Sequence, residues 1–155
     1  MDRVRRALVL MLPAVPLASA WADHRASKVV ELDIASDGDT LAFVPDHLSC
    51  VTRAHVRLRL RHTGVISSDP HDWVLLKPGM ESVFLADADR QRSDDIVIPP
   101  NDADMVIAAT PLCAKGATVT VEFIAPAPGR YPFVCSVPGH GATMRGILSV
   151  TARTS

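Results

Sequence analysis

One segment near the C-terminal end of the chain reads Tyr131-Pro-Phe-Val-Cys-Ser-Val-Pro-Gly-His-Gly-Ala-Thr-Met-Arg-Gly-Ile-Leu148. It sets a thiol, an imidazole and a thioether, those of Cys135, His140 and Met144, in the spacing Cys-x4-His-x3-Met. Apolar residues on both sides predict two strands, residues 130–135 and 146–150, and a Pro-Gly pair turns the chain between them. The segment therefore predicts a strand–loop–strand unit that presents three potential metal ligands at one end of a sheet.

Taken alone, each of these side chains has a structural explanation, since Met and Cys commonly pack in cores and a Cys–His pair can also be a nucleophile with its base. A Cys thiolate, two imidazoles and a weak axial Met together form the trigonal copper site used for electron transfer. His71, which precedes the apolar run Asp-Trp-Val-Leu-Leu76, offers the second imidazole. Zinc favours two or more Cys or a carboxylate and has little use for Met. The candidate ligands are therefore His71, Cys135, His140 and Met144, and the expected cofactor is one copper ion.

The rest of the chain predicts an all-β domain. Short runs of alternating polarity, separated by turn signals, predict further strands at residues 28–34, 40–44, 52–62, 71–76, 105–109 and 117–124, and an edge segment at 94–100. One short helix is expected after Lys77, because Met80, Val83, Phe84 and Ala88 recur at helical spacing. We expect a Greek-key β-sandwich of seven to eight strands with one short helical insertion.

The N-terminus has the form of a secretory signal peptide. Arg3, Arg5 and Arg6 precede an apolar run, and small residues at Ala20 and Ala22 offer cleavage sites. An uncleaved anchor is the alternative, but the run of about 14 residues is shorter than the ~20 that a spanning helix needs. The sequence predicts residues 1–22 as signal peptide, residues 23–155 as the mature domain, and export to the periplasm.

Charge and cysteine content narrow the class further. Loss of residues 1–22 leaves a net charge of −3, and the one basic run, residues 57–61, alternates with apolar residues as in a half-buried strand. Neither nucleic acid nor, after cleavage, a membrane is an expected partner. Three Cys in an exported chain leave at least one unpaired. With Cys135 on a metal, Cys50 and Cys113 could form a disulfide.

With these motifs the chain resembles a known family, the azurins, a branch of the cupredoxins. The loop of residues 131–146 is similar to the azurin copper loop, and its Cys–His gap matches azurin rather than plastocyanin or amicyanin. His71-Asp-Trp-Val-Leu resembles the azurin segment His-Asn-Trp-Val-Leu, and His62-Thr-Gly64 resembles the motif upstream of it. The resemblance covers nearly the whole mature chain and is weakest between residues 77 and 116.

The resemblance implies that His71, Cys135 and His140 bind copper in a plane with Met144 axial. It implies a periplasmic one-electron carrier that is a monomer and not an enzyme. Its expected partners are redox proteins such as a cytochrome or a periplasmic reductase. His62 is expected to pack beneath the site, either redox-linked or simply buried and neutral. Partners would dock on an apolar patch around the exposed edge of His140, formed by Leu41, Val137, Pro138, Gly139 and Ala142.

Three departures from the azurin pattern concern the neighbours of the ligands. Pro70 stands where azurins have a Gly whose carbonyl approaches copper, so this backbone contact is possible but its direction depends on the fixed φ of proline. Asp72 replaces an Asn that ties the two ligand loops together, and an ionised Asp can only accept hydrogen bonds. The azurin disulfide lacks its first Cys here, and Cys113 maps to the copper end while Cys50 maps to the opposite end, which argues against a bond between them.

Two other functions use the same residues. A copper chaperone or copper-homeostasis protein is the main alternative, but such proteins tend to bind Cu(I) in open Met- or His-rich sites, and this chain has five Met in all. A copper enzyme would need an open coordination position or a second metal, and the sequence offers no further His cluster for one.

Overall fold

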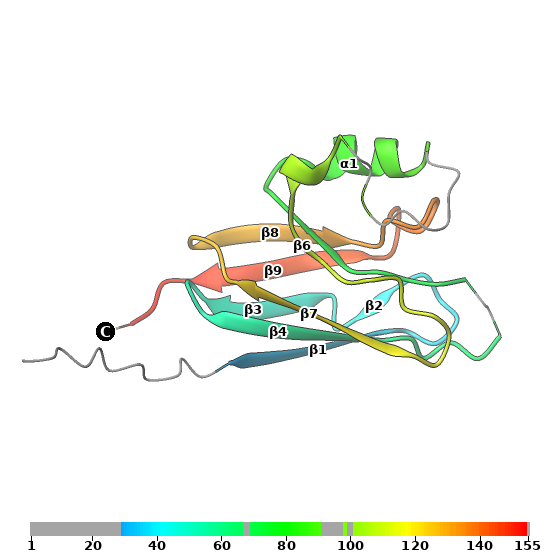
Figure 1. Cartoon of the computed structure of the whole chain (residues 1–155), viewed down its shortest axis with the longest axis horizontal. Coiled ribbons are helices and arrows are strands. Elements are labelled where there is room, and N and C mark those ends of the chain that lie inside the picture. Colours follow the sequence, from blue (N-terminus) through cyan, green and yellow to red (C-terminus); the bar gives the residue numbers. More distant parts are fainter. Residues whose placement is uncertain (1–28, 67–68, 91–97, 99–100, 155) are drawn as a thin grey trace, which may run out of the picture.

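The computed structural model describes residues 29–66, 69–90, 98 and 101–154, which form two β-sheets stacked face to face and one helix (Figure 1). The strands are β1 Val30–Ser36, β2 Phe43–Val44, β3 His47–Val51, β4 His55–Arg61, β5 Val74–Leu76, β6 Val106–Ala109, β7 Thr118–Ile124, β8 Gly129–Val134 and β9 Arg145–Thr151. One sheet has the order β2-β1-β4-β7 and the other β3-β9-β8-β5-β6. The expected all-β sandwich with one short helical insertion is confirmed.

Strict alternation of side chains builds the core between the sheets. In β4, Val56, Leu58 and Leu60 are fully buried, while the intervening Arg57 and Arg59 face outward. The period of two residues in a strand sends successive side chains to opposite faces, so the sequence pattern alone fixes which face is buried. Burying a Leu or Val side chain stabilises the fold by about 1.5–3 kcal/mol.

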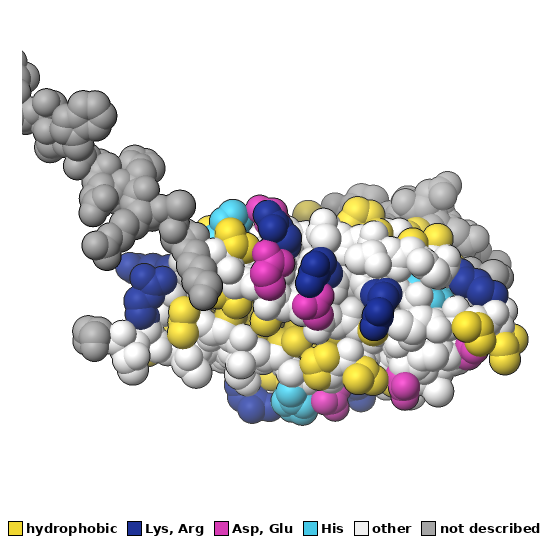
Figure 2. Space-filling view, turned by 90° about the horizontal axis from the view of Figure 1, so that it is seen from below, with side chains coloured by type: hydrophobic (Ala, Val, Ile, Leu, Met, Phe, Trp, Pro, Cys, Tyr) yellow, Lys and Arg dark blue, Asp and Glu magenta, His cyan; other side chains and the backbone are white. Residues whose placement is uncertain are grey.

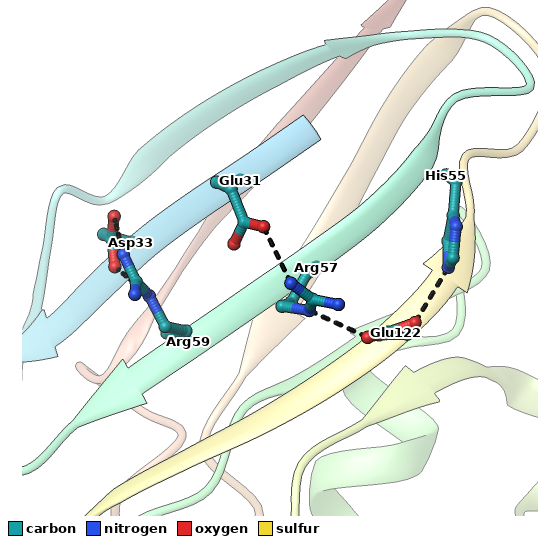
Figure 3. Close-up of polar contacts among 6 residues, drawn as sticks. All are labelled: Glu31, Asp33, His55, Arg57, Arg59 and Glu122. Carbon is teal, nitrogen blue, oxygen red and sulfur yellow. Dashed lines mark hydrogen bonds and ion pairs between the residues drawn. The ribbon is translucent and has the colours of Figure 1, made fainter. Parts of the chain in front are cut away.

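The outer face of the four-stranded sheet carries a ladder of ion pairs (Figures 2 and 3). Arg57 binds Glu31 at 3.0 Å and Glu122 at 2.8 Å, so it joins three strands. Arg59 binds Asp33 at 2.8 Å. Exposed pairs of this kind contribute only about 0–1 kcal/mol each. Arg57 and Arg59 of the basic run are thus paired within the sheet, as the interpretation of the run as a strand surface predicts.

Helix α1, Glu81–Ala88, packs on the outer face of the five-stranded sheet (Figure 1). Phe84 and Ala88 are buried there against Val74, Leu76 and Val134. The expectation that Val83 belongs to the buried face is wrong, because its side chain is 51% exposed. Met80 is also exposed, at 37%, and forms the N-cap without a side-chain hydrogen bond. A short 3-10 helix, η1 Ala103–Met105, precedes β6.

The structure has nine named strands in its described residues, against the seven to eight expected. Strand β3 was not predicted, and the predicted strand at 52–62 begins three residues later, as β4 at His55. Arg53, between β3 and β4, has a φ of 60°, a left-handed conformation that breaks a strand. Because this conformation is uncommon for Arg, the residue type did not predict the break. The predicted edge segment at 94–100 lies outside the described residues, except Ile98, which is in a bend.

The predicted signal peptide, residues 1–22, also lies outside the part of the chain that the structure describes. Within that described part, none of the helices has the length and apolar character needed to cross a membrane.

Gly146 in β9 should not tolerate a side chain. A Cβ built there would lie 2.1 Å from the carbonyl oxygen of Asp46 and 2.4 Å from Cζ of the buried Phe133. Because neither group can move freely, Gly146→Ala is expected to lower the free energy of unfolding by about 2 kcal/mol, as overpacking does. Urea unfolding of the metal-free protein measures this. Gly129→Ala is the matched control, since its nearest contact would be a milder 3.3 Å, to an atom of the Tyr131 ring, which needs to shift by only a few tenths of an ångström. Equal losses in both variants would contradict the steric explanation.

Candidate metal centre

The sandwich brings His71 and the segment of residues 135–144, here called the ligand loop, to the same end. β5 and β8 are neighbours, with Val74 opposite Val134. His71 stands just before β5, and Cys135 follows directly after β8 in the antiparallel direction. Antiparallel neighbours place the start of one strand beside the end of the next, so these two side chains meet at one pole.

His71, Cys135 and His140 are buried, and one ligand atom from each lies within 4.8 Å of the others. The two Nδ1 atoms of His71 and His140 are 3.3 Å apart, and Sγ of Cys135 lies 3.7 Å from Nδ1 of His140. Metal bonds of about 2.0–2.1 Å to nitrogen and 2.3 Å to sulfur, spread at 120° in a plane, require edges of roughly 3.5 and 3.8 Å. The donor set and its spacing therefore fit one ion in a trigonal N₂S site.

Backbone hydrogen bonds within the ligand loop hold these groups in place. The Met144 N–H donates to the carbonyl of His140, and the Cys135 N–H donates to the carbonyl of Met144, both at 2.9 Å. The Met144 side chain is fully buried in the core cluster that also contains Cys135. The thioether thus enters the interior at the ligand end of the sandwich, where the sequence predicts an axial ligand.

Burial sets the protonation states of the three clustered groups. It lowers the pKa of His71 to about 4, with repulsion from His62 and His140 contributing, and it also lowers the pKa of His140. Both imidazoles are therefore neutral at pH 7 and keep a lone pair for a metal. Burial, and secondarily the charge of Asp72, raises the pKa of the Cys135 thiol well above its ordinary value. A metal ion must displace this proton to bind the sulfur.

Asp72 ties the two ligand segments together. One carboxylate oxygen accepts the Ser136 backbone N–H at 2.6 Å, and the other accepts the Ser136 hydroxyl. This is the acceptor role that the sequence predicts for an Asp at this position. The side chain is fully buried, and burial raises the pKa of Asp72 to about 6, although the bonds from Ser136 oppose the rise.

His62 lies under the site, as expected. Its ring stacks on that of His71 with centroids 4.4 Å apart, and it is 2% exposed. The His62 Nδ1 accepts the Gly64 N–H at 3.0 Å, which leaves Nε2 protonated to donate to the Asp69 carbonyl at 3.0 Å. Both ring nitrogens thus have hydrogen-bond partners in the protein, and the ring is held in place beneath His71.

The three cysteines are free thiols. Cys113 pairs through its backbone with His71, so it lies at the ligand end. Cys50 lies opposite Val150, near the far end of β9. Cys50 and Cys113 therefore occupy opposite ends of the sandwich, as the argument against a disulfide between them requires.

Two site predictions concern the surface and the fifth ligand. Leu41, Pro138, Gly139 and Ala142 are exposed, while Val137 is half-buried. A metal contact of the Pro70 carbonyl stays a prediction. Sequence reasoning missed Asp89 beyond the end of α1, whose carboxylate accepts the Gly139 N–H at 2.8 Å. The sequence offered one indication of this contact, an acidic residue at a helix C-terminus, where a negative charge is unfavourable unless it has a partner.

Comparison with known proteins also indicates a copper-binding protein. The family described as "Copper binding proteins, plastocyanin/azurin family" matches residues 30–151. Auracyanin-A of Chloroflexus aurantiacus is 34% identical over 122 residues, which cover 78% of this chain and 74% of the relative. Azurin iso-2 of Methylomonas sp. is 28% identical, covering 74% of this chain and 93% of the relative. Auracyanin-B of Chloroflexus aurantiacus is 32% identical, but the match spans only about half of its length, 52%.

Solved structures agree with the fold. The structure of auracyanin A, titled a "blue" copper protein, has a TM-score of 0.71 and 30% identity, and covers 80% of this chain and all of that one, 100%. The two-sheet sandwich with a buried His–Cys–His cluster at one end defines a cupredoxin, the blue copper class of electron-transfer proteins. The chain belongs to the plastocyanin/azurin family of copper-binding proteins.

Proposed function

We propose that this chain binds one copper ion through His71, Cys135 and His140, with Met144 as the axial ligand, and carries single electrons between redox proteins. The observation that carries the assignment is the ligand-atom triangle, with edges of 3.3 and 3.7 Å in a buried cluster. When bound, copper supplies a Cu(I)/Cu(II) couple that takes up and releases one electron.

The contribution of the chain is to keep the ligands in one arrangement. His71 is held by its backbone pairing with Cys113. Cys135 is held by the hydrogen bond from its backbone N–H to the Met144 carbonyl. A preformed site changes little between oxidation states, which keeps the reorganisation energy of electron transfer small. Burial of His71, Cys135 and His140 restricts the access of water to the ligand atoms.

We also propose export and a docking surface. The signal-peptide pattern of residues 1–22 supports a periplasmic location, in which the mature domain acts alone as a monomer. The exposed residues of the patch near His140, namely Leu41, Pro138, Gly139 and Ala142, suit a small transient contact with a cytochrome or a periplasmic reductase. The net charge of −3 that remains after loss of residues 1–22 predicts weak electrostatic steering of such partners.

Copper titration of the metal-free protein tests the function. One equivalent of Cu(II) should produce an intense visible thiolate-to-copper charge-transfer band, and voltammetry should show a reversible one-electron wave. A colourless protein that passes Cu(I) to an acceptor would instead indicate a copper chaperone, and turnover of oxygen or nitrite would indicate an enzyme.

Asp72 should lower the reduction potential, because a fixed negative charge beside the site favours the more positive oxidation state. Asp72→Asn keeps the shape and removes the charge: its one amide oxygen can still accept the Ser136 N–H, and its NH2 can donate to the Ser136 hydroxyl oxygen. At pH 8 we expect its potential to be higher by roughly 60 mV, equivalent to about 1.4 kcal/mol for one electron. Protein-film voltammetry measures the difference, with Asp104→Asn, an exposed Asp on η1, as control. An unchanged or lower potential would sink this explanation.

A further inference from the structure

One face of helix α1 lies along the ligand loop. Glu81, Leu85 and the following Asp89 recur at intervals of four residues, so they share one side of the helix. Glu81 binds Arg145, the first residue of β9, at 2.8 Å. Leu85 packs on the bare backbone of Gly141, where an added Cβ would lie 2.2 Å from a Leu85 methyl carbon. The helix thus contacts the loop at its β9 end and directly beside His140.

Asp89 makes the third contact, on the other side of His140. Its Oδ1 accepts the backbone N–H of Gly139 at 2.8 Å. In Figure 1 the C-terminal end of α1 lies above the orange segment that joins β8 and β9. The residues before and after His140 in the chain are therefore both held by this helix.

Gly139 occupies a special place in a turn. The His140 N–H donates to the Val137 carbonyl at 2.9 Å, and Gly139 has a φ of +81°. Pro at the second position and a left-handed Gly at the third define a type II β-turn of residues 137–140. The N–H that Asp89 accepts belongs to the central peptide of this turn.

The central peptide is what distinguishes the two common turn types. Types I and II have similar end residues but opposite orientations of the peptide between positions two and three. With Gly at position three, either orientation is sterically open. A hydrogen bond to the Gly139 N–H selects between them, and so fixes the backbone conformation of the residue that directly precedes His140.

Asp89 lies where its charge does not stabilise the helix. It is the C-cap of α1, and the last turn of the helix contains no basic residue. A carboxylate is unfavourable at a helix C-terminus, where the exposed carbonyls already carry partial negative charge. The bond to Gly139 offsets that repulsion.

We propose that Asp89 is a positioning residue for His140: its carboxylate locks the turn of residues 137–140 in the type II form and so fixes the imidazole within the ligand set. The role of Asp89 in the ligand set rests on the proposed function, that is, on copper binding by His140. The contact itself exists without a metal, so it can be tested in the metal-free protein.

The test compares Asp89→Ala, which removes the acceptor, with Asp89→Asn, which keeps an amide oxygen at the same place. In the full-length, metal-free protein, NMR records amide hydrogen exchange at Gly139 and the ring resonances of His140. Loss of one hydrogen bond should speed Gly139 exchange about tenfold in Asp89→Ala and broaden or shift the His140 ring signals. Asp89→Asn and the control Asp104→Ala should remain close to the wild type. The thermal midpoint should be similar in all four proteins.

Four results would overturn the proposal: unchanged Gly139 exchange in Asp89→Ala, unchanged His140 ring signals, an Asn variant as impaired as the Ala variant, or a rise in exchange spread evenly over the chain with a lower thermal midpoint. The EPR spectrum of the Cu(II)-loaded proteins gives a second reading, in which only Asp89→Ala should change the copper hyperfine splitting. If the wild type fails to bind copper, the proposed function fails, while the metal-free NMR readings still decide on Asp89.

Discussion

Cys135→Ser should abolish the intense visible band of the copper-loaded protein and its reversible one-electron wave. The band requires a thiolate bound to Cu(II), and Ser offers a hard oxygen whose proton is far more difficult to displace. Removing outer-shell partners of a metal typically costs 10–100-fold in affinity, so loss of a direct ligand should weaken copper binding by at least about 100-fold. Absorption and EPR spectra with equimolar Cu(II), together with a competition titration, measure both effects.

Cys113→Ser is the matched control for this loss. Its thiol is also fully buried near His71, but it points at the backbone carbonyls of Leu60 and Ala117, at 3.6 and 3.3 Å. A hydroxyl can keep these contacts, so the variant should retain the blue colour. If Cys135→Ser kept the band, or Cys113→Ser lost it, the assignment of the thiolate ligand would be wrong.

The ligand loop could be predicted from the sequence because its chemistry is local. Cys135, His140 and Met144 lie on one continuous segment between two strands, so a residue spacing already restricts their distances. His71 was harder, since it is 64 residues from Cys135 in the numbering of the chain. It could be predicted because it precedes an apolar run, and a short buried strand in a sandwich ends at one of two poles.

The fold class could be predicted from the sequence, but the strand boundaries and the buried face of the helix could be predicted only in part. Strand β3 was missed although Leu48 and Cys50 alternate with polar residues in it, and the predicted strand at 52–62 included Arg53, whose left-handed φ of 60° separates β3 from β4. In α1, helical spacing placed Val83 with Phe84, although only Phe84 faces the sheet. In so short a helix, apolar residues point in several directions, and which of them is buried depends on how the helix packs on the sheet.

The supporting contacts of the site could not be predicted from spacing at all. Asp89 reaches the Gly139 N–H across 50 positions of the chain, and Leu85 fills the space that Gly141 leaves open. Such contacts depend on the docking of a helix on a sheet, which no local pattern encodes. Asp72 lies between these cases: its acceptor role followed from its chemistry, and its complete burial is seen only in the structure.

That burial makes the metal-free protein less stable than it could be. The pKa of Asp72 is about 6 in the folded chain, against an ordinary value of 3.8. Between these values the folded state holds a proton that the unfolded state has released, so the contribution of Asp72 to stability falls as the pH rises through this window. Above pH 6 the folded protein carries the full cost of a buried carboxylate, about 3 kcal/mol.

Asp72→Asn should therefore stabilise the metal-free protein by about 3 kcal/mol at pH 8 and by little at pH 4, because the neutral amide never bears that cost. The lowered pKa of His71 acts in the opposite direction, removing stability as the pH falls below 6.5 towards 4, but it does so in both proteins and cancels in their difference. Urea unfolding at the two pH values measures the gain, with Asp104→Asn as the exposed control. A gain of equal size at pH 4 and pH 8 would mean that packing, not ionisation, is responsible. If the gain does depend on pH, then a copper ion bound beside Asp72 would compensate the same charge, and the carboxylate that weakens the empty fold would stabilise the loaded one.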